Sequence, residues 1–126
     1  GCIPSKALLD SSEHFYNAGH TFKEHGIDIP APMVNLPQMI KRKREVVKAN
    51  VDGIAFLMKK NKIDVHTGVG SFVDKNTIAI TSAEGTKNIT TEKVIIATGS
   101  KPTPLPFAAF DKKRIISSTE ALELKE

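Results

Sequence analysis

The spacing of apolar residues predicts two helices in the first half of the chain. In residues 4–19, the positions at helical spacing are Ala7, Leu8, Ser11, Phe15 and Ala18. Pro4 suits the first helical turn, and Gly19 then Gly26 end the element. A second, longer stripe consists of Leu36, Ile40, Val47, Val51, Ile54 and Met58. With Asn35 as its N-cap, this helix would make about seven turns and end near Asn61. We therefore expect an antiparallel helical pair over residues 1–61.

After Asn61 the period of the pattern changes from 3.6 to 2. Ile63, Val65 and Thr67 alternate with polar residues, as do Ile78 and Ile80, and residues typical of turns occupy 74–76 and 83–86. This pattern predicts three or four short antiparallel strands, a β-meander, over residues 62–92. Two glycines within the pattern indicate either a plain bulge or a close approach of two backbones; they are Gly68 and Gly70.

The run Val94–Ala97 is continuously apolar and mostly β-branched. Such a run is typical of a central parallel strand that is buried on both faces. It leads into Thr98, Gly99 and Ser100, so residues 93–100 are expected to form a strand and a turn. Backbone N–H groups at the carboxyl edge of a sheet often bind ligands, although many strands end in glycine only to turn.

The remaining residues, 101–126, are expected to form an extended connection and a short helix. Prolines at alternate positions keep the first part extended; they are Pro102, Pro104 and Pro106. A capping box between Ser117 and Glu120 then predicts a helix start.

Composition narrows the class of protein. The 126 residues are 40% hydrophobic and 25% charged, which is ordinary for one soluble domain. There is no apolar run of 18 residues, so no membrane span is expected, and no signal peptide is visible. The net charge of +4 comes from dispersed lysines. The basic run Lys41–Arg44 has no aromatic residues among it, which favours the solvated face of a helix over a nucleic-acid site.

Cys2, the only cysteine, is the first candidate for chemistry. A lone cysteine is most often a small buried hydrophobe, and a lone lysine is usually a solvated surface group. Here Cys2 immediately precedes a predicted helix, whose N-terminus favours a thiolate, and Lys6 adds a positive charge one turn later. Together they predict a redox or nucleophilic centre. The four histidines do not pair on one helical face, so we expect no zinc site.

The segment Gly-Cys-Ile-Pro-Ser-Lys-Ala-Leu-Leu at the start of the chain resembles the active-site segment of the flavin disulfide reductase family. Ile3 and Ser5 side with the lipoamide branch over the glutathione and mercuric reductase branches. Segments that begin at Ile54, His66, Ile95 and Ser117 resemble the same family in the same order. The resemblance covers the whole chain, which begins without Met, and we expect the chain to be a piece of a longer protein.

This resemblance implies an α/β fold that is part of a Rossmann-like FAD-binding domain. A helical hairpin and a β-meander would precede a parallel strand that returns to the sheet. Cys2 would be the flavin-proximal half of a redox disulfide, and Lys6 would lie near the flavin. Gly70 would contact the adenine end of FAD through its backbone. A turn would close over the cofactor, formed by Thr98, Gly99 and Ser100.

The resemblance also implies an activity. The intact enzyme would oxidise protein-bound dihydrolipoamide and pass electrons through the disulfide and FAD to NAD+. It would be a homodimer that serves the lipoyl domains of 2-oxoacid dehydrogenase complexes. We expect it in the cytoplasm of a bacterium, or in the mitochondrial matrix if the source is a eukaryote. No nucleic-acid or membrane partner is expected.

The 126 residues lack the family's G-x-G-x-x-G motif, its second redox cysteine, its NAD domain and its catalytic His-Glu pair. We therefore expect the chain alone to retain little or no FAD and to reduce no NAD+. Two alternatives stay open. One is membership of the mercuric or glutathione reductase branch. The other is a non-enzymatic module that binds an anionic partner through the basic second helix.

Overall fold

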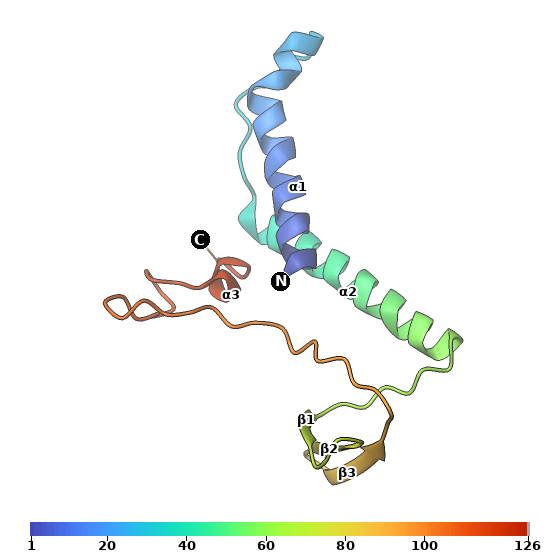
Figure 1. Ribbon diagram of the computed structural model, residues 1–126. Helices are drawn as coiled ribbons and strands as arrows, with labels where there is room; N and C mark the ends of the chain where they lie inside the picture. The colour runs from blue at the N-terminus through green and yellow to red at the C-terminus, as the bar shows by residue number, and fades with distance from the viewer. Residues whose placement is uncertain (126) are drawn as a thin grey trace. The chain divides into compact units, whose positions relative to one another are not determined.

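The computed structural model describes residues 1–125, which form two compact units. The first unit contains residues 1–55 and 102–125, and the second contains residues 56–101. The elements in chain order are α1 (Cys2–Gly19), the 3-10 helix η1 (Thr21–His25), α2 (Leu36–Lys60), β1 (Val69–Phe72), β2 (Thr77–Ser82), β3 (Gly85–Thr90) and α3 (Ser118–Ala121) (Figure 1).

Both predicted long helices are present. α1 begins at Cys2, two residues earlier than expected, and still ends at Gly19. The short helix η1 follows, and Gly26 ends it in the left-handed conformation with φ 74°, which glycine adopts without strain. The predicted N-cap of the second helix is confirmed, because the Asn35 side-chain oxygen accepts a hydrogen bond from the Gln38 N–H at 3.1 Å.

The core of the first unit is small. Ala7 and Ile40 are its buried apolar side chains among the described residues, and the charged side chain of Lys43 is also buried. Much of the apolar stripe of α2 is exposed, including Val51 and Ile54. The apolar periodicity therefore correctly indicated one apolar face of α2, but within residues 1–125 much of this face is exposed to solvent.

The second unit holds an antiparallel sheet in the order β1-β2-β3. Gly70 is paired with Ile80, and Ile78 is paired with Ile89. The turn between β1 and β2 is closed by the Asp74 carboxylate, which accepts a hydrogen bond from the Asn76 N–H at 2.8 Å. The expected β-meander thus has three strands. The alternating residues 63–67 form no strand.

The strand expected at Val94–Ala97 is absent, and this prediction was wrong for the described chain. These residues have no regular structure, and Ile95 is 92% exposed and Ile96 is 70% exposed. A central parallel strand needs neighbours on both sides. The one sheet within residues 1–125 is the antiparallel meander, and it does not pair with this run. Helices with an antiparallel sheet remain consistent with an α/β fragment.

Residues 102–117 form an irregular connection and not the extended one that was expected: a turn at 106–107 closes an isolated bridge between Leu105 and Ala108, and bends follow at 112–115. The predicted capping box then starts α3: the Ser117 hydroxyl accepts from the Thr119 N–H at 3.1 Å, and the Glu120 carboxylate accepts from the Ser117 N–H at 2.8 Å. Within residues 1–125, no helix combines the length and apolar character that crossing a membrane requires.

Candidate functional site

Cys2 is the first residue of α1 and carries a free, exposed thiol. The sequence predicted that Cys2 would lie just before the helix, whereas in the structure Cys2 is the first helical residue. Lys6, one turn later, is also exposed. The Ser5 hydroxyl and the Ser5 N–H both donate to the Gly1 carbonyl, at 2.7 and 3.2 Å. These bonds fix the first turn internally, because Gly1 offers no side-chain cap.

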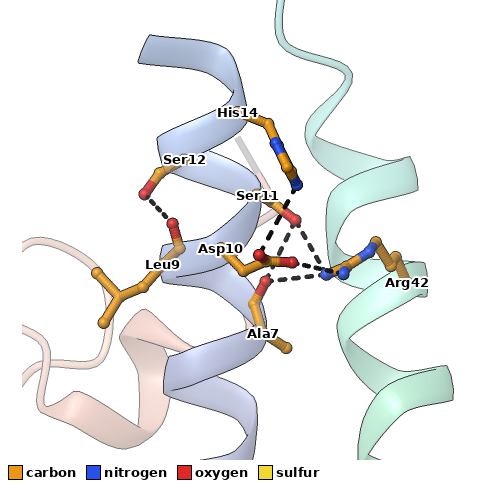
Figure 2. A network of polar contacts seen from close by, with 7 residues as sticks. All are labelled: Ala7, Leu9, Asp10, Ser11, Ser12, His14 and Arg42. Carbon is orange, nitrogen blue, oxygen red and sulfur yellow. Dashed lines mark hydrogen bonds and ion pairs between the residues drawn. The ribbon is translucent and has the colours of Figure 1, made fainter. Parts of the chain in front are cut away.

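Arg42 of α2 holds the second turn of α1 (Figure 2). One guanidinium nitrogen, Nη1, donates to the Ala7 carbonyl at 3.1 Å and to the Ser11 hydroxyl at 3.2 Å. The other, Nη2, pairs with the Asp10 carboxylate at 2.6 Å. His14 lies 3.7 Å from the other oxygen of the same carboxylate. The guanidinium therefore joins three groups of one helix at a single point.

The next two residues of α2 bind the C-terminal part of the first unit. The Lys43 ammonium pairs with one oxygen of the Glu123 carboxylate, and Arg44 Nη2 pairs with the other oxygen at 2.5 Å. Only 3% of the Lys43 side chain is exposed. Hydrogen bonds from Lys43 and then from Arg44 lower the pKa of Glu123 from its ordinary value. The segment that follows α3 is thereby fastened to α2.

The expectation that Lys41–Arg44 is the solvated face of a helix is wrong for Lys43, which is buried, whereas Lys41 and Arg44 are exposed and Arg42 is half-buried. Arg42, Lys43 and Arg44 each bind an acidic side chain elsewhere in the first unit. Lys41 makes only a 3.9 Å pair to Glu45, one turn along the same helix. The run is mainly a structural connection.

A mostly apolar groove of about 410 Å³ lies beside these ion pairs in the first unit. It is bordered by the first turn of α1, by α2 and by α3. Its lining includes Pro4, Val47, Val51 and Leu122. Since Pro4 lies two residues after Cys2, the groove adjoins the helical turn that carries the thiol.

In the second unit, Gly70 and Thr98 line one groove of about 300 Å³. Most of the other lining residues are apolar: Phe72, Ile78, Val94, Ile95, Ile96 and Ala97. A methyl group at Gly70 would make an ordinary 3.8 Å contact with Ile78. Gly99 has φ 75°, a conformation that costs other residues strain, but residues 98–100 form neither a turn nor a bend, so the turn expected there is not present. Ser100 is exposed and is not part of the groove lining.

The predicted site residues therefore fall into two groups. Gly70 and Thr98 are brought together in the second unit, while Cys2 and Lys6 belong to the first unit. Arg42 and the pair of Lys43 with Glu123 were missed. No local signal marks them, because their partners are 35 and 80 positions away in the sequence.

Gly68 is the glycine that marks a close backbone approach. An added Cβ would lie 2.6 Å from the Thr81 carbonyl oxygen and 2.9 Å from the Ile80 side chain. Of the two alternatives left open by the sequence, close approach therefore holds at Gly68.

Within residues 1–125, no group of three or more His, Cys, Asp or Glu side chains is arranged to hold a metal ion. His20 instead stacks on Tyr16, with ring centroids 4.4 Å apart.

The sequence over residues 1–126 matches the family model described as pyridine nucleotide-disulphide oxidoreductase. The chain belongs to this family of oxidoreductases. Individual relatives carry a more specific name. The chain is 44% identical over its whole length to the mitochondrial dihydrolipoyl dehydrogenase of Schizosaccharomyces pombe and 46% identical to that of Rattus norvegicus. It is 43% identical to dihydrolipoyl dehydrogenase 1, mitochondrial, of Arabidopsis thaliana. The match covers 25% of each of these proteins, so the chain spans about a quarter of their length.

The groove of the second unit has a lining and size that suit part of a dinucleotide. Its apolar walls suit a flat aromatic ring, and the backbone at Gly70 is accessible in it. A volume of about 300 Å³ is at the small end of ligand sites, so it accommodates one end of a dinucleotide rather than the whole. Of the residues expected to contact the cofactor, Gly70 and Thr98 line this groove.

Proposed function

We propose that this chain is part of the FAD-binding domain of a dihydrolipoyl dehydrogenase, which oxidises protein-bound dihydrolipoamide with NAD+. One observation carries the proposal: relatives of that name match the chain from end to end, including the segment around Cys2. The exposed thiol in the first turn of an ordered helix supports it, because thiol exchange requires access to the sulfur.

Cys2 would act as one half of a redox disulfide. The second sulfur would come from a cysteine outside residues 1–126, since Cys2 is the only cysteine in the sequence. The two thiols of the substrate become a disulfide, and the enzyme's disulfide becomes two thiols. Two electrons and two protons thereby pass from the substrate to the enzyme. Lys6, one turn from Cys2, would place a positive charge beside the reduced sulfur.

Gly70 would contact the adenine end of FAD through its backbone, and Thr98, Gly99 and Ser100 would close over the cofactor. FAD supplies a two-electron carrier between a dithiol and NAD+. The NAD+ itself would bind residues outside this chain. We propose that the 126 residues alone neither retain FAD nor reduce NAD+, because they hold only part of the expected FAD cradle and lack both an NAD site and the second sulfur that thiol exchange needs. Stoichiometric flavin absorbance of the chain after gel filtration would refute this.

We propose that the parent protein is a homodimer. Its proposed partners are the lipoyl domains of 2-oxoacid dehydrogenase complexes. The proposed compartment is the bacterial cytoplasm, or the mitochondrial matrix for a eukaryotic source. The alternative of a basic module for an anionic partner is less well supported, since Arg42, Lys43 and Arg44 are engaged within the first unit.

A substitution at Cys2 in the parent protein tests the proposal. The wild-type parent should form NADH from NAD+ and dihydrolipoamide. Cys2→Ser should lower kcat by at least about a thousandfold, because the exchanging sulfur is gone, while flavin absorbance is kept. Ser12→Ala is the matched control, since Ser12 is exposed and bonds only the Leu9 carbonyl of its own helix. A parent that instead uses glutathione disulfide or Hg²⁺ would place the chain in another branch.

A further inference from the structure

We infer that Arg42 is a positioning residue for Cys2: it holds the helix that presents the thiol. This inference rests on the proposed function, in which Cys2 exchanges with a dithiol. Arg42 belongs to α2 and touches neither Cys2 nor Lys6 in any hydrogen bond or ion pair of the described residues. It acts on the turn that follows them, so its role is to orient and not to react.

The geometry is that of a three-point clamp (Figure 2). Arg42 donates to the Ala7 carbonyl at 3.1 Å, to the Ser11 hydroxyl at 3.2 Å and to the Asp10 carboxylate at 2.6 Å. A guanidinium has five N–H donors in a rigid plane, so it can satisfy acceptors in several fixed directions at once. A lysine ammonium on a flexible stem has only three donors and no plane.

The three contacts of Arg42 differ in how strongly they restrain α1. The pair with Asp10 joins two side chains that are 43% and 49% exposed, and such pairs contribute little to stability. The bond to the Ala7 carbonyl instead binds the backbone of a buried residue, five positions after Cys2. The Ser11 hydroxyl also donates to the same carbonyl, at 3.2 Å. The backbone contact therefore fixes the rotation and position of α1 more strictly than the ion pair does.

The start of α1 has few other restraints. Gly1 supplies no side-chain cap, and the first turn contains no acidic residue. The Ser5 bonds to the Gly1 carbonyl lie within the turn itself. Few apolar side chains of the first unit are buried, with Ala7 of α1 and Ile40 of α2 as the buried ones among the described residues. Loss of the Arg42 clamp should thus let the turn that carries Cys2 shift, and a displacement near 1 Å can cost a reaction about a hundredfold.

The test compares four variants of the parent protein: Arg42→Met, Arg42→Lys, Asp10→Asn and the control Lys41→Met. The measurements are kcat and KM for dihydrolipoamide oxidation, thermal unfolding, and amide hydrogen exchange in residues 5–12. We expect Arg42→Met to lower kcat about tenfold or more with the KM for NAD+ unchanged, and to speed exchange in α1 by a similar factor. Arg42→Lys should recover little. Asp10→Asn and Lys41→Met should stay within about twofold of wild type.

An unchanged kcat in Arg42→Met overturns the inference, even if the melting temperature falls, since that result shows a purely stabilising role. Full rescue by Arg42→Lys, or an Asp10→Asn variant as slow as Arg42→Met, also overturns it, because the ion pair would then be sufficient. If Arg42→Met does not fold, the kcat of Arg42→Lys decides: a lowered kcat supports the inference, and a kcat equal to that of the wild type overturns it. A wild-type parent that oxidises no dihydrolipoamide refutes the proposed function instead. In that case kcat for the disulfide substrate that the parent protein does use is measured in the same four variants. These values and amide exchange in α1 then test whether Arg42 positions Cys2.

Discussion

The ammonium group of Lys43 is buried against the carboxylate of Glu123, which lies 80 positions later in the chain. Glu123 is about half exposed, and its second oxygen is held by Arg44 at 2.5 Å. Lys43 is therefore the partner that has lost its contact with water, and the negative charge of Glu123 compensates for that loss. Because the neighbouring Arg42 binds α1, consecutive positions of α2 secure both ends of the first unit's sequence.

Removing the carboxylate should release the segment around α3. Glu123→Gln leaves Lys43 buried without a countercharge, which is more damaging than the loss of the pair as such. We expect amide exchange in residues 117–123 to rise roughly tenfold, less than for a fully buried pair. The double variant Glu123→Gln with Lys43→Met removes both charges and should exchange more slowly than Glu123→Gln alone.

Arg44→Gln is the control for this pair, since Arg44 is exposed and its loss should matter little. Equal exchange in the single variant Glu123→Gln and in the double variant would mean that the buried ammonium carries no penalty.

Acid should loosen the same segment. The pKa of Glu123 is lowered by Lys43 and Arg44, the pKa of Glu120 by hydrogen bonds from Ser117, and the pKa of Asp111 by the N–H groups of Lys113, Ile115 and Arg114. A carboxylate with a lowered folded pKa stabilises the fold fully above its unfolded value. That contribution is lost as the pH falls through the folded value.

The ordinary pKa values are 4.5 for Glu123 and Glu120 and 3.8 for Asp111, so residues 111–123 should hold at neutral pH and open progressively below about pH 4.5. Amide exchange or NMR over a pH series measures this. The response should be smaller in Glu123→Gln. If residues 111–123 opened as the pH rose instead, the stabilising role of these three carboxylates would be contradicted.

Two glycines of the β1 region should respond oppositely to the same change. Gly68→Ala places a methyl 2.6 Å from the Thr81 carbonyl oxygen, a backbone atom that cannot turn aside, and should destabilise the sheet by about 2 kcal/mol. Gly70→Ala makes an ordinary 3.8 Å contact and should leave the sheet intact. Urea unfolding followed by circular dichroism of the sheet would compare them. A Gly68→Ala variant as stable as Gly70→Ala would show that the close approach relaxes freely.

Features of the fold that depend on residues close in sequence were predictable. The Asn35 cap and the capping box of Ser117 and Glu120 each join residues three positions apart, so the pattern contains all of their chemistry. The turns of the β-meander are local in the same way. The contacts of Arg42 and Lys43 are not, because no periodicity relates a basic residue to a carbonyl or a carboxylate many turns away.

The run Val94–Ala97 shows a different limit. Its composition suits a strand, but a strand exists only when another strand offers hydrogen bonds, and residues 1–125 offer none to this run. The candidate site was likewise predictable only in part. Resemblance singled out Cys2, Gly70 and Thr98, and the structure places the last two in one groove. The contacts by which Arg42 of α2 holds α1, the helix of Cys2, could not be predicted from the segment around Cys2.

Gly70→Ala also separates the fold of the groove from its proposed ligand. Because Gly70 lines the groove together with Thr98, and Ile78 would tolerate an added methyl, this methyl should narrow the space for a ring without disturbing the sheet. In the parent protein we expect the Kd for FAD to rise roughly tenfold, the usual effect of one misplaced methyl group. The measurement is the ratio of flavin to protein absorbance after gel filtration, with titration of FAD into the stripped protein. Gly53→Ala is the control, since an added Cβ there meets no atom within 4 Å and should only stabilise α2, by about 1 kcal/mol. Undiminished flavin binding in Gly70→Ala would remove this groove from the cofactor site.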